Sequence, residues 1–575
     1  MKNIDTEKVL HDLGFLTEIE GDTNASFKAR AYHRAADVIA SLSSNVEDIY
    51  RKEGLQGLLA IPSIGKAIAS KIEEYITTGK IQHLEDLREK IPIAIEELSS
   101  IEGIGPKTIK ILYDKLKVKD LSDLERVASE GKLRSIPGFT EKKEQAILKH
   151  IEFFKQGKGR RLIGEVYPFI KEIESHLSQI KGVKHAIAAG SVRRMKETIG
   201  DIDYLVVSSS SDKVIDYFVA MPEVQHILSR GESKASVLLN NGIDADLLVV
   251  PERSFGSALQ YFTGSKEHVV DIRKLAIVKS LRMNEWGVFD KNEQQVAGST
   301  EEEVYRALSL DWIPPEMREN KGEIELAKYG KLPKLIEYGS LKGDLQVHSN
   351  NTDGTMSIEE MAIVAKEKFG FEYVAITDHT KSLTLAHGLD EEELIDQANR
   401  IAELNDKLDN FRILSAAEVN IMKDGSLDIP NNVLDRLDIV GAAIHSNFSQ
   451  PMEVQTDRLV KAAQNPSVDI LFHPTGRLIN KREGYQIDVE KVIDVAKDTG
   501  TVLEIDAHYN RLDLKDDYIR MAVQKQVKLV IDSDAHHPVH YSFLMLGIAQ
   551  ARRGWAEQSD ILNTLSVDEL LKKLK

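Results

Sequence analysis

The chain contains no cysteine among its 575 residues. This absence excludes disulfide bonds, thiolate zinc sites, iron–sulfur clusters and a cysteine nucleophile. Any metal site must therefore use His, Asp, Glu or Gln side chains. The sequence also lacks an apolar run of about 18 residues, which a membrane-spanning helix needs, and its first residues lack the basic start and apolar stretch of a signal peptide. We expect a cytoplasmic protein with no membrane partner.

The composition is that of a globular protein, with 42% hydrophobic and 29% charged residues, and the length suggests three to four domains at about 100–200 residues each. The net charge of −17 is unevenly distributed. Residues 1–160 contain 26 basic and 26 acidic residues, whereas residues 338–575 contain 26 basic and 39 acidic residues. An acidic total does not exclude DNA binding through a local patch or through backbone amides. The acidic last segment can instead hold cations.

The periodicity of apolar residues changes along the chain. Residues 1–155 show the three-and-four spacing of helices, and residues 160–320 mix helices with strands at 202–207 and 245–250. Residues 321–340 contain scattered Gly and Pro and are predicted to be a linker. From residue 342 onwards, short apolar runs alternate with helical patterns, which favours parallel strands with crossover helices in a closed or nearly closed barrel. These predicted strands are 373–377, 413–419, 439–444, 470–472, 502–505 and 529–531.

The helical segment contains an internal repeat with copies at 61–66, 101–107 and 136–142. Its glycines expose backbone N–H groups at the start of the next helix, where a phosphate can dock. The repeat resembles the helix-hairpin-helix motif, which implies binding to the DNA backbone without reading of sequence. The alternative is a set of plain helix pairs with glycine caps. Ser63 replaces the first glycine of the first copy, and Thr140 replaces the second glycine of the third. The predicted DNA contacts are Gly65, Gly103, Gly105, Lys107 and Gly138.

The segment 190–203 reads GSVRRMKETIGDID. On a strand, Asp201 and Asp203 point to the same face, and two like charges so close are unfavourable unless a divalent cation neutralises them. A third carboxylate follows at Asp246, with Asp244 on the same face as an alternative. Converging carboxylates can hold two Mg²⁺ or Mn²⁺ ions for nucleotidyl transfer. An Asp-x-Asp pair alone would be more typical of a solvated strand or turn.

The whole string resembles the nucleotidyltransferase signature of DNA polymerase family X, the family of DNA polymerase beta. The run Tyr261-Phe262-Thr263-Gly264, continuing to Arg273, extends the resemblance. It implies that Asp201, Asp203 and Asp246 are the catalytic metal ligands, and Asp246 is preferred because of its spacing to the following proline. Val269 departs from the family pattern, which has Asn in contact with the incoming base. The implied nucleotide-binding residues are Gly190, Ser191, Arg194, Gly200, Tyr261, Phe262, Gly264 and Arg273.

The N-terminal segment resembles the lyase-type domain of the same family, over residues 27–36 and the first hairpin. Lys71 falls at the family's Schiff-base lysine, which attacks the sugar aldehyde at a damaged 5′ end. Such a nucleophile must be neutral and needs a pocket that lowers its pKa. Alternatively, Lys71 binds a 5′-phosphate together with Lys28 and Tyr32, or is an ordinary helix lysine. Ala67 stands where some members have another basic residue.

In the last segment, metal-type side chains recur at the ends of the predicted strands. Barrel enzymes place catalytic groups there, and imidazoles with carboxylates suit Mn²⁺, Zn²⁺ or Fe²⁺. Any one of the histidines could be a core residue, but together they favour a cluster of two to three ions, with Glu418 as a bridge. Their order resembles the PHP (polymerase and histidinol phosphatase) domain, although Gln346 replaces a histidine. The predicted ligands are Gln346, His348, Asp353, His379, Glu418, His445, His473, Asp534 and His536.

The order of these segments resembles a bacterial or archaeal family X DNA polymerase with a C-terminal PHP domain. The predicted fold is multidomain α+β and α/β: a helical lyase-like domain (1–90), a helix-hairpin-helix domain (91–158), a nucleotidyltransferase palm (159–250), a nucleotide-binding subdomain (251–320), a linker (321–340) and a PHP α/β barrel (341–575). We expect a monomer that fills gaps or nicks in double-stranded DNA from deoxynucleoside triphosphates during base excision repair. The PHP domain would add exonuclease, AP endonuclease or 3′-phosphoesterase activity. The alternatives are a phosphoesterase whose palm only positions DNA and a DNA-end-binding scaffold.

Overall fold

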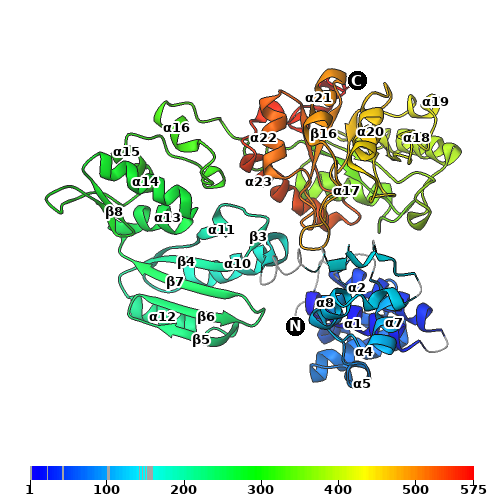
Figure 1. Cartoon of the computed structure of the whole chain (residues 1–575), viewed down its shortest axis with the longest axis horizontal. Coiled ribbons are helices and arrows are strands. Elements are labelled where there is room, and N and C mark those ends of the chain that lie inside the picture. The colour runs from blue at the N-terminus through cyan, green and yellow to red at the C-terminus, as the bar shows by residue number, and fades with distance from the viewer. Residues whose placement is uncertain are drawn as a thin grey trace. The chain divides into compact units, whose positions relative to one another are not determined.

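The structure is a computed structural model that describes residues 3–21, 24–41, 45–99, 101, 104–136, 138–141, 143–145, 147–148, 151 and 160–574. Contacts divide the chain into two units (Figure 1). The first comprises residues 1–158 with 480–482, and the second comprises 159–479 with 483–575. No helix within the described ranges is long and apolar enough to cross a membrane.

The described part of the first unit is helical. Its helices bury apolar residues at three-and-four spacing, as α4 does with Ile68, Ala69 and Ile72. Two cores result, one among α1 to α5 and the other formed mainly by α6 to α8. The helices are α1 (Asn3–Glu20), α2 (Ala25–Ser41), α3 (Val46–Leu59), α4 (Lys66–Thr78), α5 (Gln82–Lys90), α6 (Ile95–Ser99), α7 (Pro106–Leu116) and α8 (Leu121–Ser129), followed by the short 3₁₀ helix η1 (Lys132–Ser135).

The second unit begins with a five-stranded sheet of order β2-β4-β7-β6-β5, in which only β4 and β7 are parallel neighbours. Alternate residues of β4 serve opposite faces: Ile202, Tyr204 and Val206 belong to the core that includes α10 and α12, whereas Leu205 and Val207 pack with α13. The elements are β1 (Arg161–Leu162), α10 (Ile163–Ser178), β2 (Val183–Ala188), α11 (Gly190–Arg193), β3 (Thr198–Ile199), β4 (Asp201–Ser208), α12 (Ser211–Val219), β5 (Val224–Arg230), β6 (Lys234–Leu239) and β7 (Asp244–Val250).

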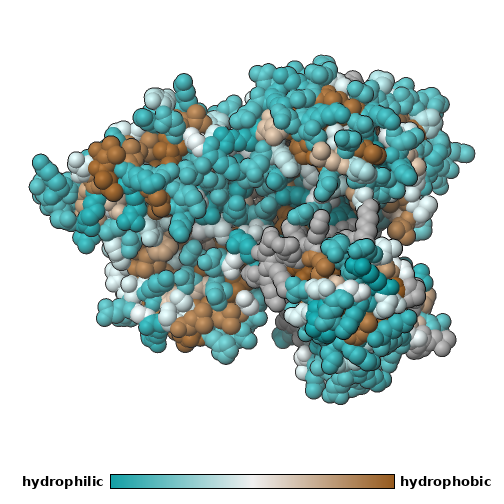
Figure 2. Space-filling model, in the orientation of Figure 1, coloured by the Kyte–Doolittle hydropathy of each residue, from teal (hydrophilic) through white to brown (hydrophobic). Residues whose placement is uncertain are grey.

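A smaller subdomain follows, with helices around a three-stranded antiparallel sheet of order β10-β9-β8. Apolar side chains gather on the surface over α14 and α15 (Figure 2), and Ile277 and Val278 at the end of α14 are largely exposed. The elements are α13 (Phe255–Thr263), α14 (Lys266–Val278), β8 (Arg282–Asn284), β9 (Gly287–Phe289), β10 (Gln295–Ala297), α15 (Glu301–Ala307) and α16 (Glu323–Lys328).

The rest of the chain forms a parallel seven-stranded sheet whose order follows the sequence from β11 to β17. A parallel bridge between Val347 and Ala535 and a hydrogen bond from the Leu345 amide to Asp532 nearly close it into a barrel. The strands are β11 (Gly343–Val347), β12 (Tyr373–Ile376), β13 (Arg412–Asn420), β14 (Ile439–Ala443), β15 (Ile470–Leu471), β16 (Val502–Asp506) and β17 (Leu529–Asp532). The helices are α17 (Ile358–Phe369), α18 (Glu391–Asn405), α19 (Asn431–Leu434), α20 (Met452–Ala463), α21 (Val489–Thr499), α22 (Asp516–Gln524), α23 (Leu544–Arg553) and α24 (Val567–Leu571).

The barrel and the five-stranded sheet share a core within the second unit. Leu512, Leu546 and Ala549 of the barrel domain belong to the same apolar cluster as the residues of α10 and β4. Trp555, just after α23, belongs to the core of the smaller subdomain. Such shared burial favours a fixed arrangement of these domains over a loose tether.

The stretch 321–340 differs from the predicted linker. It contains α16, and Ala327 and Leu335 belong to the core that includes Trp555. Ile336 belongs to the main core of the barrel domain. The Gly and Pro residues that suggested a linker punctuate a segment that packs against parts of the chain more than two hundred residues away.

Candidate active sites

The pairing of β4 with β7 places acidic side chains side by side. Asp203 is opposite Asp246 and Asp201 is opposite Asp244, so all four carboxylates share one face of the sheet. Further along this face, Leu205 and the residues after it pack beneath α13. The carboxylates therefore lie at the uncovered start of two strands that are otherwise anchored in cores on both faces.

The surroundings of Asp203 disfavour its ionised form. Burial, reinforced by the charges of Asp201 and Asp246, raises the pKa of Asp203 to about 6. Gly190, with φ of +56°, allows the chain to pass so close that a Cβ there would lie 2.5 Å from Asp203 Oδ2. A divalent cation bound between these carboxylates would offset both the cost of burying the Asp203 charge and the repulsion from Asp201 and Asp246. Asp246 instead pairs with Lys234 at 3.0 Å.

A cavity of about 520 Å³ opens beside Asp201 and Asp203. The Ser191 hydroxyl on its wall is buried and has no hydrogen-bond partner among the described residues, which leaves it available to a ligand. Gly200 and Asp246 are not on the cavity wall. The lining residues are Arg160, Gly190, Ser191, Arg194, Asp201, Asp203, Tyr261, Phe262, Gly264, Lys266, Val269, Val270 and Arg273.

Arg194 on the cavity wall is held in place by two hydrogen bonds. Its guanidinium donates to Glu319 at 3.0 Å and to the carbonyl of Thr263. Gly264, with φ of +70°, allows this approach, since a Cβ there would lie 2.9 Å from Arg194 Nη1.

Arg193 has a different function: it forms a two-pronged bond with Glu301, which also binds the buried Arg318. Two further cavity residues, Arg160 and Lys266, were not predicted from the sequence. Lys266 directly follows Gly264-Ser265 in the motif, whereas Arg160 lies outside it.

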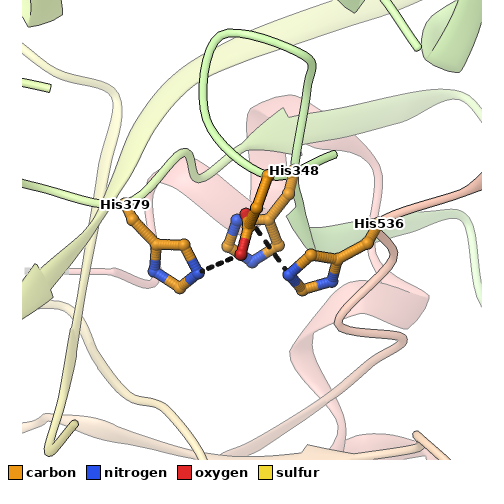
Figure 3. Close-up of side chains that lie close together, drawn as sticks. His348, His379 and His536 are labelled. Atoms are coloured by element: carbon orange, nitrogen blue, oxygen red, sulfur yellow. Dashed lines mark ion pairs between the residues drawn. The ribbon is translucent and has the colours of Figure 1, made fainter. Parts of the chain in front are cut away.

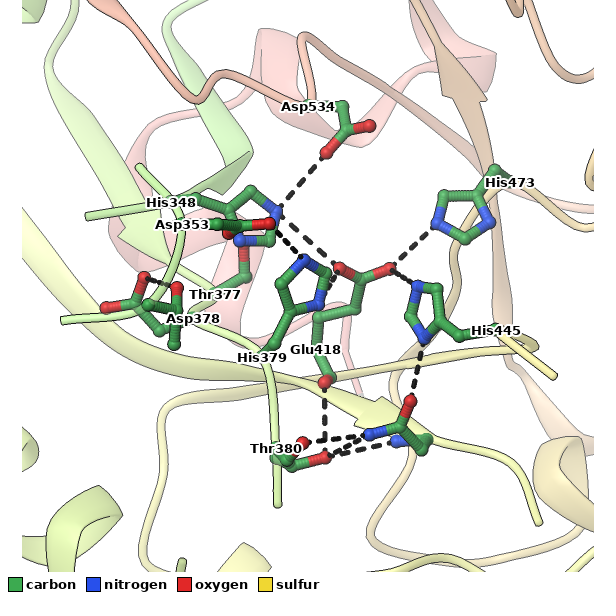
Figure 4. A network of polar contacts seen from close by, with 12 residues as sticks. His348, Asp353, Thr377, Asp378, His379, Thr380, Glu418, His445, His473 and Asp534 are labelled. Carbon is green, nitrogen blue, oxygen red and sulfur yellow. Dashed lines mark hydrogen bonds and ion pairs between the residues drawn. The ribbon is translucent and has the colours of Figure 1, made fainter. Parts of the chain in front are cut away.

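A second cluster lies at the carboxyl ends of the barrel strands, around Glu418 of β13 (Figure 4). Glu418 Oε1 lies 2.8 Å from His473 Nε2 and 3.1 Å from His445 Nε2. Its other oxygen lies 2.9 Å from His379 Nδ1 and 3.5 Å from His348 Nε2. One buried carboxylate thus contacts four imidazoles, which is the arrangement expected of a bridging ligand.

Asp353 joins the other side of this cluster as part of a group with His348, His379 and His536. Figure 3 shows how these three histidines lie together. The two oxygens of Asp353 lie 3.5 Å from His379 Nε2 and 3.5 Å from His536 Nε2. Ligand atoms of these four residues lie within 4.8 Å of one another, as do those of His379, Glu418 and His445. Because His379 belongs to both groups, the two candidate metal positions are adjacent.

The remaining predicted ligands lie at the edge of these groups. Asp534 Oδ1 is 3.2 Å from His348 Nε2, and both Asp534 and His473 have the left-handed backbone that concentrates at functional sites. Gln346 is buried, and its amide donates to Glu504 in the orientation that satisfies both groups. Asn420, which the sequence analysis did not identify, lies 2.8 Å from His445 Nδ1. It can fix the tautomer that presents Nε2 to a metal.

The pKa shifts of the histidines around Glu418 and Asp353, called the barrel cluster below, are those expected of a site where a metal ion replaces protons. Burial would lower the pKa of His379, but Glu418 and Asp353 raise it to about 10. Burial likewise opposes ionisation of His536, yet Asp353 and Asp534 raise its pKa to about 9. Glu418 Oε2 and His379 Nδ1 are buried and 2.9 Å apart, yet they are not aligned to form a hydrogen bond, and His348 Nε2 is likewise buried without one. Metal ions would satisfy such atoms and displace the protons.

In the first unit, Lys71 lies on α4 and is half-buried. Burial lowers the pKa of Lys71, although Glu74 acts in the opposite direction. The Tyr32 ring is buried in the core that includes Ile68 and Ile72, and burial raises the pKa of its hydroxyl. Lys28 is exposed on α2. A lowered pKa at Lys71 is the direction that a neutral lysine nucleophile needs.

The hairpin glycines are only partly within the described residues. Gly65 and Gly105 directly precede α4 and α7 as N-caps, and open space surrounds both. Ser63 has φ of 64°, the left-handed conformation that glycine favours. Gly138 has φ of 88° and is also surrounded by open space. Gly103 and the side chain of Lys107 lie outside the described residues.

Comparisons with known proteins agree with this architecture. A helix-hairpin-helix domain family matches residues 1–81, a SAM-like helix-hairpin-helix tandem matches 95–152, and the DNA polymerase beta thumb matches 258–319. The chain is 36% identical to the DNA polymerase/3′-5′ exonuclease PolX of Bacillus subtilis, with both chains covered completely. A probable phosphatase of Thermoanaerobacter matches 33% of the chain, over 78% of its own length, at 29% identity. One of Caldanaerobacter matches 28%, over 61% of its own length, at 30% identity. The chain therefore belongs to the DNA polymerases of family X, in the group that has a C-terminal PHP domain.

Proposed function

We propose that this protein is a DNA-directed DNA polymerase that extends a 3′ end into short gaps. One observation carries the proposal: Asp201 and Asp203 face a cavity that also contains Arg194, Ser191 and the Tyr261–Phe262 wall. A triphosphate needs cations and free donors, and the sugar and base need an apolar surface. The cavity offers all of these beside the paired carboxylates. The full-length similarity to a polymerase of Bacillus subtilis supports the same function.

The residues have distinct roles in this reaction. Asp201, Asp203 and Asp246 would hold two Mg²⁺ or Mn²⁺ ions, which supply activation of the attacking hydroxyl and neutralisation of the leaving pyrophosphate. The primer 3′-oxygen attacks the α-phosphorus, and the bond to pyrophosphate breaks. Arg194, held by Glu319 and the Thr263 carbonyl, would bind the triphosphate without needing to reorient. Ser191 and Gly190 would complete the phosphate contacts, and Arg273 on α14 would contact the triphosphate or the template side.

We propose a 3′-5′ exonuclease activity for the barrel domain. The Glu418 cluster provides enough ligands for two to three Mn²⁺, Zn²⁺ or Fe²⁺ ions, which would supply hydroxide at neutral pH. The histidines that surround Glu418 and Asp353 would hold the ions, with Asp534 beside His348 and Gln346 as a weaker carbonyl ligand. Cleavage at abasic sites or removal of 3′ blocking groups would use the same centre.

The test uses a duplex with a one-nucleotide gap, a 5′-phosphate and a 3′-labelled primer. With Mg²⁺ and all four deoxynucleotides, we expect the label to gain one residue only when the templated nucleotide is present. With Mn²⁺ and no nucleotides, we expect the label to shorten. A label that never lengthens under any condition would contradict the polymerase assignment.

Reciprocal variants separate the two centres. Asp201→Asn should abolish extension and leave shortening intact, whereas His379→Ala should abolish shortening and leave extension intact. Each variant is the matched control for the other, since both change a polar group at a strand end. If Asp201→Asn still extends the primer at the wild-type rate, the carboxylates of β4 do not hold the polymerase metals.

A second candidate function is a nuclease whose palm only positions DNA. The salt bridge between Lys234 and Asp246 favours it, because it occupies a predicted ligand. Val269 on the cavity wall also lacks the hydrogen-bonding capacity that a side-chain amide would offer the incoming base. Extension that remains absent in both Mg²⁺ and Mn²⁺ would favour this alternative, provided that the exonuclease is active.

We further propose that the first unit binds the 5′ side of the gap through its hairpins, as base excision repair requires, and that the protein acts as a cytoplasmic monomer. Lys28, Tyr32 and Lys71 would contact the 5′-phosphate. If Lys71 also acts as a lyase, borohydride should trap a covalent complex with a 5′-deoxyribose phosphate, and Lys71→Ala should abolish it. Retention of the trapped complex in that variant would assign the chemistry to another amine.

A further inference from the structure

Arg511 lies in the turn that follows β16, against the edge of the barrel cluster. Its Nε is 3.4 Å from Asp506 Oδ2 and 3.7 Å from Asp534 Oδ2. The other oxygen of Asp534 is 3.2 Å from His348 Nε2 (Figure 4). A single carboxylate therefore separates the guanidinium from the imidazoles that would hold the metal ions.

The hydrogen-bonding capacity of Arg511 is unused within the described part of the chain. Its side chain makes the two ion-pair contacts and no side-chain hydrogen bond there, and 24% of it remains exposed to solvent. Two other arginines of the second unit differ: Arg477 donates to Glu197 and to a backbone carbonyl, and Arg553 donates to Glu319 and Asp516. Those two arginines join structural elements, whereas Arg511 retains N–H groups without a hydrogen-bond partner among the described residues, beside the side chains that could hold metal ions.

The backbone holds Arg511 in a fixed place. Its amide and that of Leu512 both donate to the carbonyl of His508, at 2.8 and 3.0 Å. The carbonyl of Asn510 accepts from the Ile479 amide at 2.7 Å. Leu512 is buried in the core shared with the palm. A cation anchored in this way loses little conformational freedom when it binds an anion.

We propose that Arg511 binds the phosphate that the exonuclease attacks, and therefore also the nucleoside 5′-monophosphate that is released. This inference rests on the proposed exonuclease function. In the reaction, a water oxygen bonds to phosphorus, the bond from phosphorus to the 3′-oxygen breaks, and that oxygen leaves with a proton. Arg511 remains protonated and donates to the non-bridging oxygens. A guanidinium suits this role because two parallel N–H groups match a phosphate.

A purely structural role for Arg511 makes a different prediction. If it only balanced the charges of Asp506 and Asp534, any cation at this position would serve. Lysine would then suffice, and the binding of phosphate products would not change. The bidentate geometry of arginine matters only if a planar, two-oxygen ligand is bound.

The experiment compares full-length wild type with Arg511→Ala, Arg511→Lys and Lys381→Ala, each loaded with Mn²⁺. Lys381 is the matched control, because it is a rim cation that is already paired with Glu391. We expect Arg511→Ala to lose about 100-fold in exonuclease kcat/KM and Arg511→Lys to recover only a small part. Added guanidinium should partly rescue Arg511→Ala. Manganese content and primer extension should match wild type.

Equilibrium binding of thymidine 5′-monophosphate provides the readout that does not depend on turnover. We expect its affinity to fall about tenfold in Arg511→Ala and to stay unchanged in Lys381→Ala. Equal affinity in wild type and Arg511→Ala would overturn the proposal, as would loss of bound manganese in Arg511→Ala. If wild type binds the nucleotide through Arg511 yet never shortens DNA, the exonuclease function fails while the phosphate site stands.

Discussion

Asp203 is a residue whose ionisation costs the folded protein free energy when no metal is bound. Its pKa is raised to about 6 by burial and by Asp201 and Asp246, whereas an unfolded chain has about 3.9. The folded state therefore binds more protons between these values, so its stability falls as pH rises from about 4 to about 6. Above that window, the ionised carboxylate destabilises the fold by at most about 3 kcal/mol.

Asp203→Asn should consequently raise the melting temperature in chelator at pH 7.5, and the difference from wild type should vanish near pH 4. The same variant should lose polymerase activity by about 100-fold or more, because the amide cannot bind a cation as a carboxylate does. Asp244→Asn is the control, since Asp244 is exposed on the same face. Thermal scans across pH would contradict the argument if the variant is no more stable than wild type at pH 7.5.

Arg160 should contribute to nucleotide binding although it lies outside the palm motif. It lines the cavity and donates to the hydroxyl and carbonyl of Thr198, at 3.0 and 2.6 Å. Gly200 permits this contact, since a Cβ there would lie 2.8 Å from Arg160 Nη1. Arg160→Ala should raise KM for the nucleotide about tenfold, through loss of a charge-assisted contact, with a smaller effect on kcat. Arg161→Ala is the control, because Arg161 donates to the Asn241 carbonyl and is not on the cavity wall. Steady-state kinetics in which the two variants behave alike would rule out a specific role.

At the scale of single residues, sequence reasoning succeeds where the motif is local and fails where tertiary contacts decide. Asp201 and Asp203 share a face because a strand alternates. Arg160 reaches the cavity through the antiparallel pairing of β1 with β3, which nothing in the local pattern indicates. Asn420 lies beside His445 because it ends β13, which pairs with β14, the strand just before His445. The contact between Gln346 and Glu504 depends on two strands that lie far apart in the sequence.

At the scale of elements, the turns before α4 and α7, which we predict bind phosphate, can be tested directly. Gly65 and Gly105 have extended backbones and open space around the position of a Cβ. Alanine should therefore be tolerated by the fold and yet obstruct a phosphate that approaches the amides at the start of α4 or α7. We expect several-fold weaker binding to gapped DNA for each single variant, and additive losses in free energy for the double variant. Melting temperatures near that of wild type would show that the helices persist. Unchanged affinity in the double variant would mean that these turns do not contact DNA.

The strands were predicted better than the segments that join domains. The apolar runs at 202–207 and 245–250 correspond to β4 and β7, and the runs from 373 onwards correspond to β12 to β17. Parallel strands buried on both faces are apolar almost throughout, so their positions can be predicted locally. The segment 321–340 could not be predicted in this way. Its Gly and Pro residues indicate turns, but Leu335 and Ile336 are buried by contacts with distant parts of the chain.

At the scale of the whole second unit, the barrel domain directly supports the cavity that we propose binds the nucleotide. Arg553 at the end of α23 is almost fully buried and donates to the Arg194 carbonyl at 2.9 Å and to Glu319 at 3.1 Å. Glu319 in turn accepts from Arg194 Nε at 3.0 Å. Burial would raise the pKa of Glu319, but Arg553 and Arg194 outweigh it and hold that pKa below its usual range. A shared carboxylate thus links the cavity arginine to the nuclease domain.

This link predicts that a change at Glu319 alters nucleotide binding and not nuclease chemistry. Glu319→Gln keeps the size of the side chain but weakens both charge-assisted bonds, so Arg194 should lose its fixed orientation. We expect KM for the nucleotide to rise about five- to tenfold, corresponding to about 1–1.4 kcal/mol, with DNA affinity and exonuclease rate unchanged. Asp516→Asn is the matched control, because it removes charge from another partner of Arg553 without touching Arg194. A rise in KM that is equal in both variants would mean that Arg553 stabilises the domain junction generally. An unchanged KM in Glu319→Gln would mean that Arg194 keeps its position without help from the barrel domain.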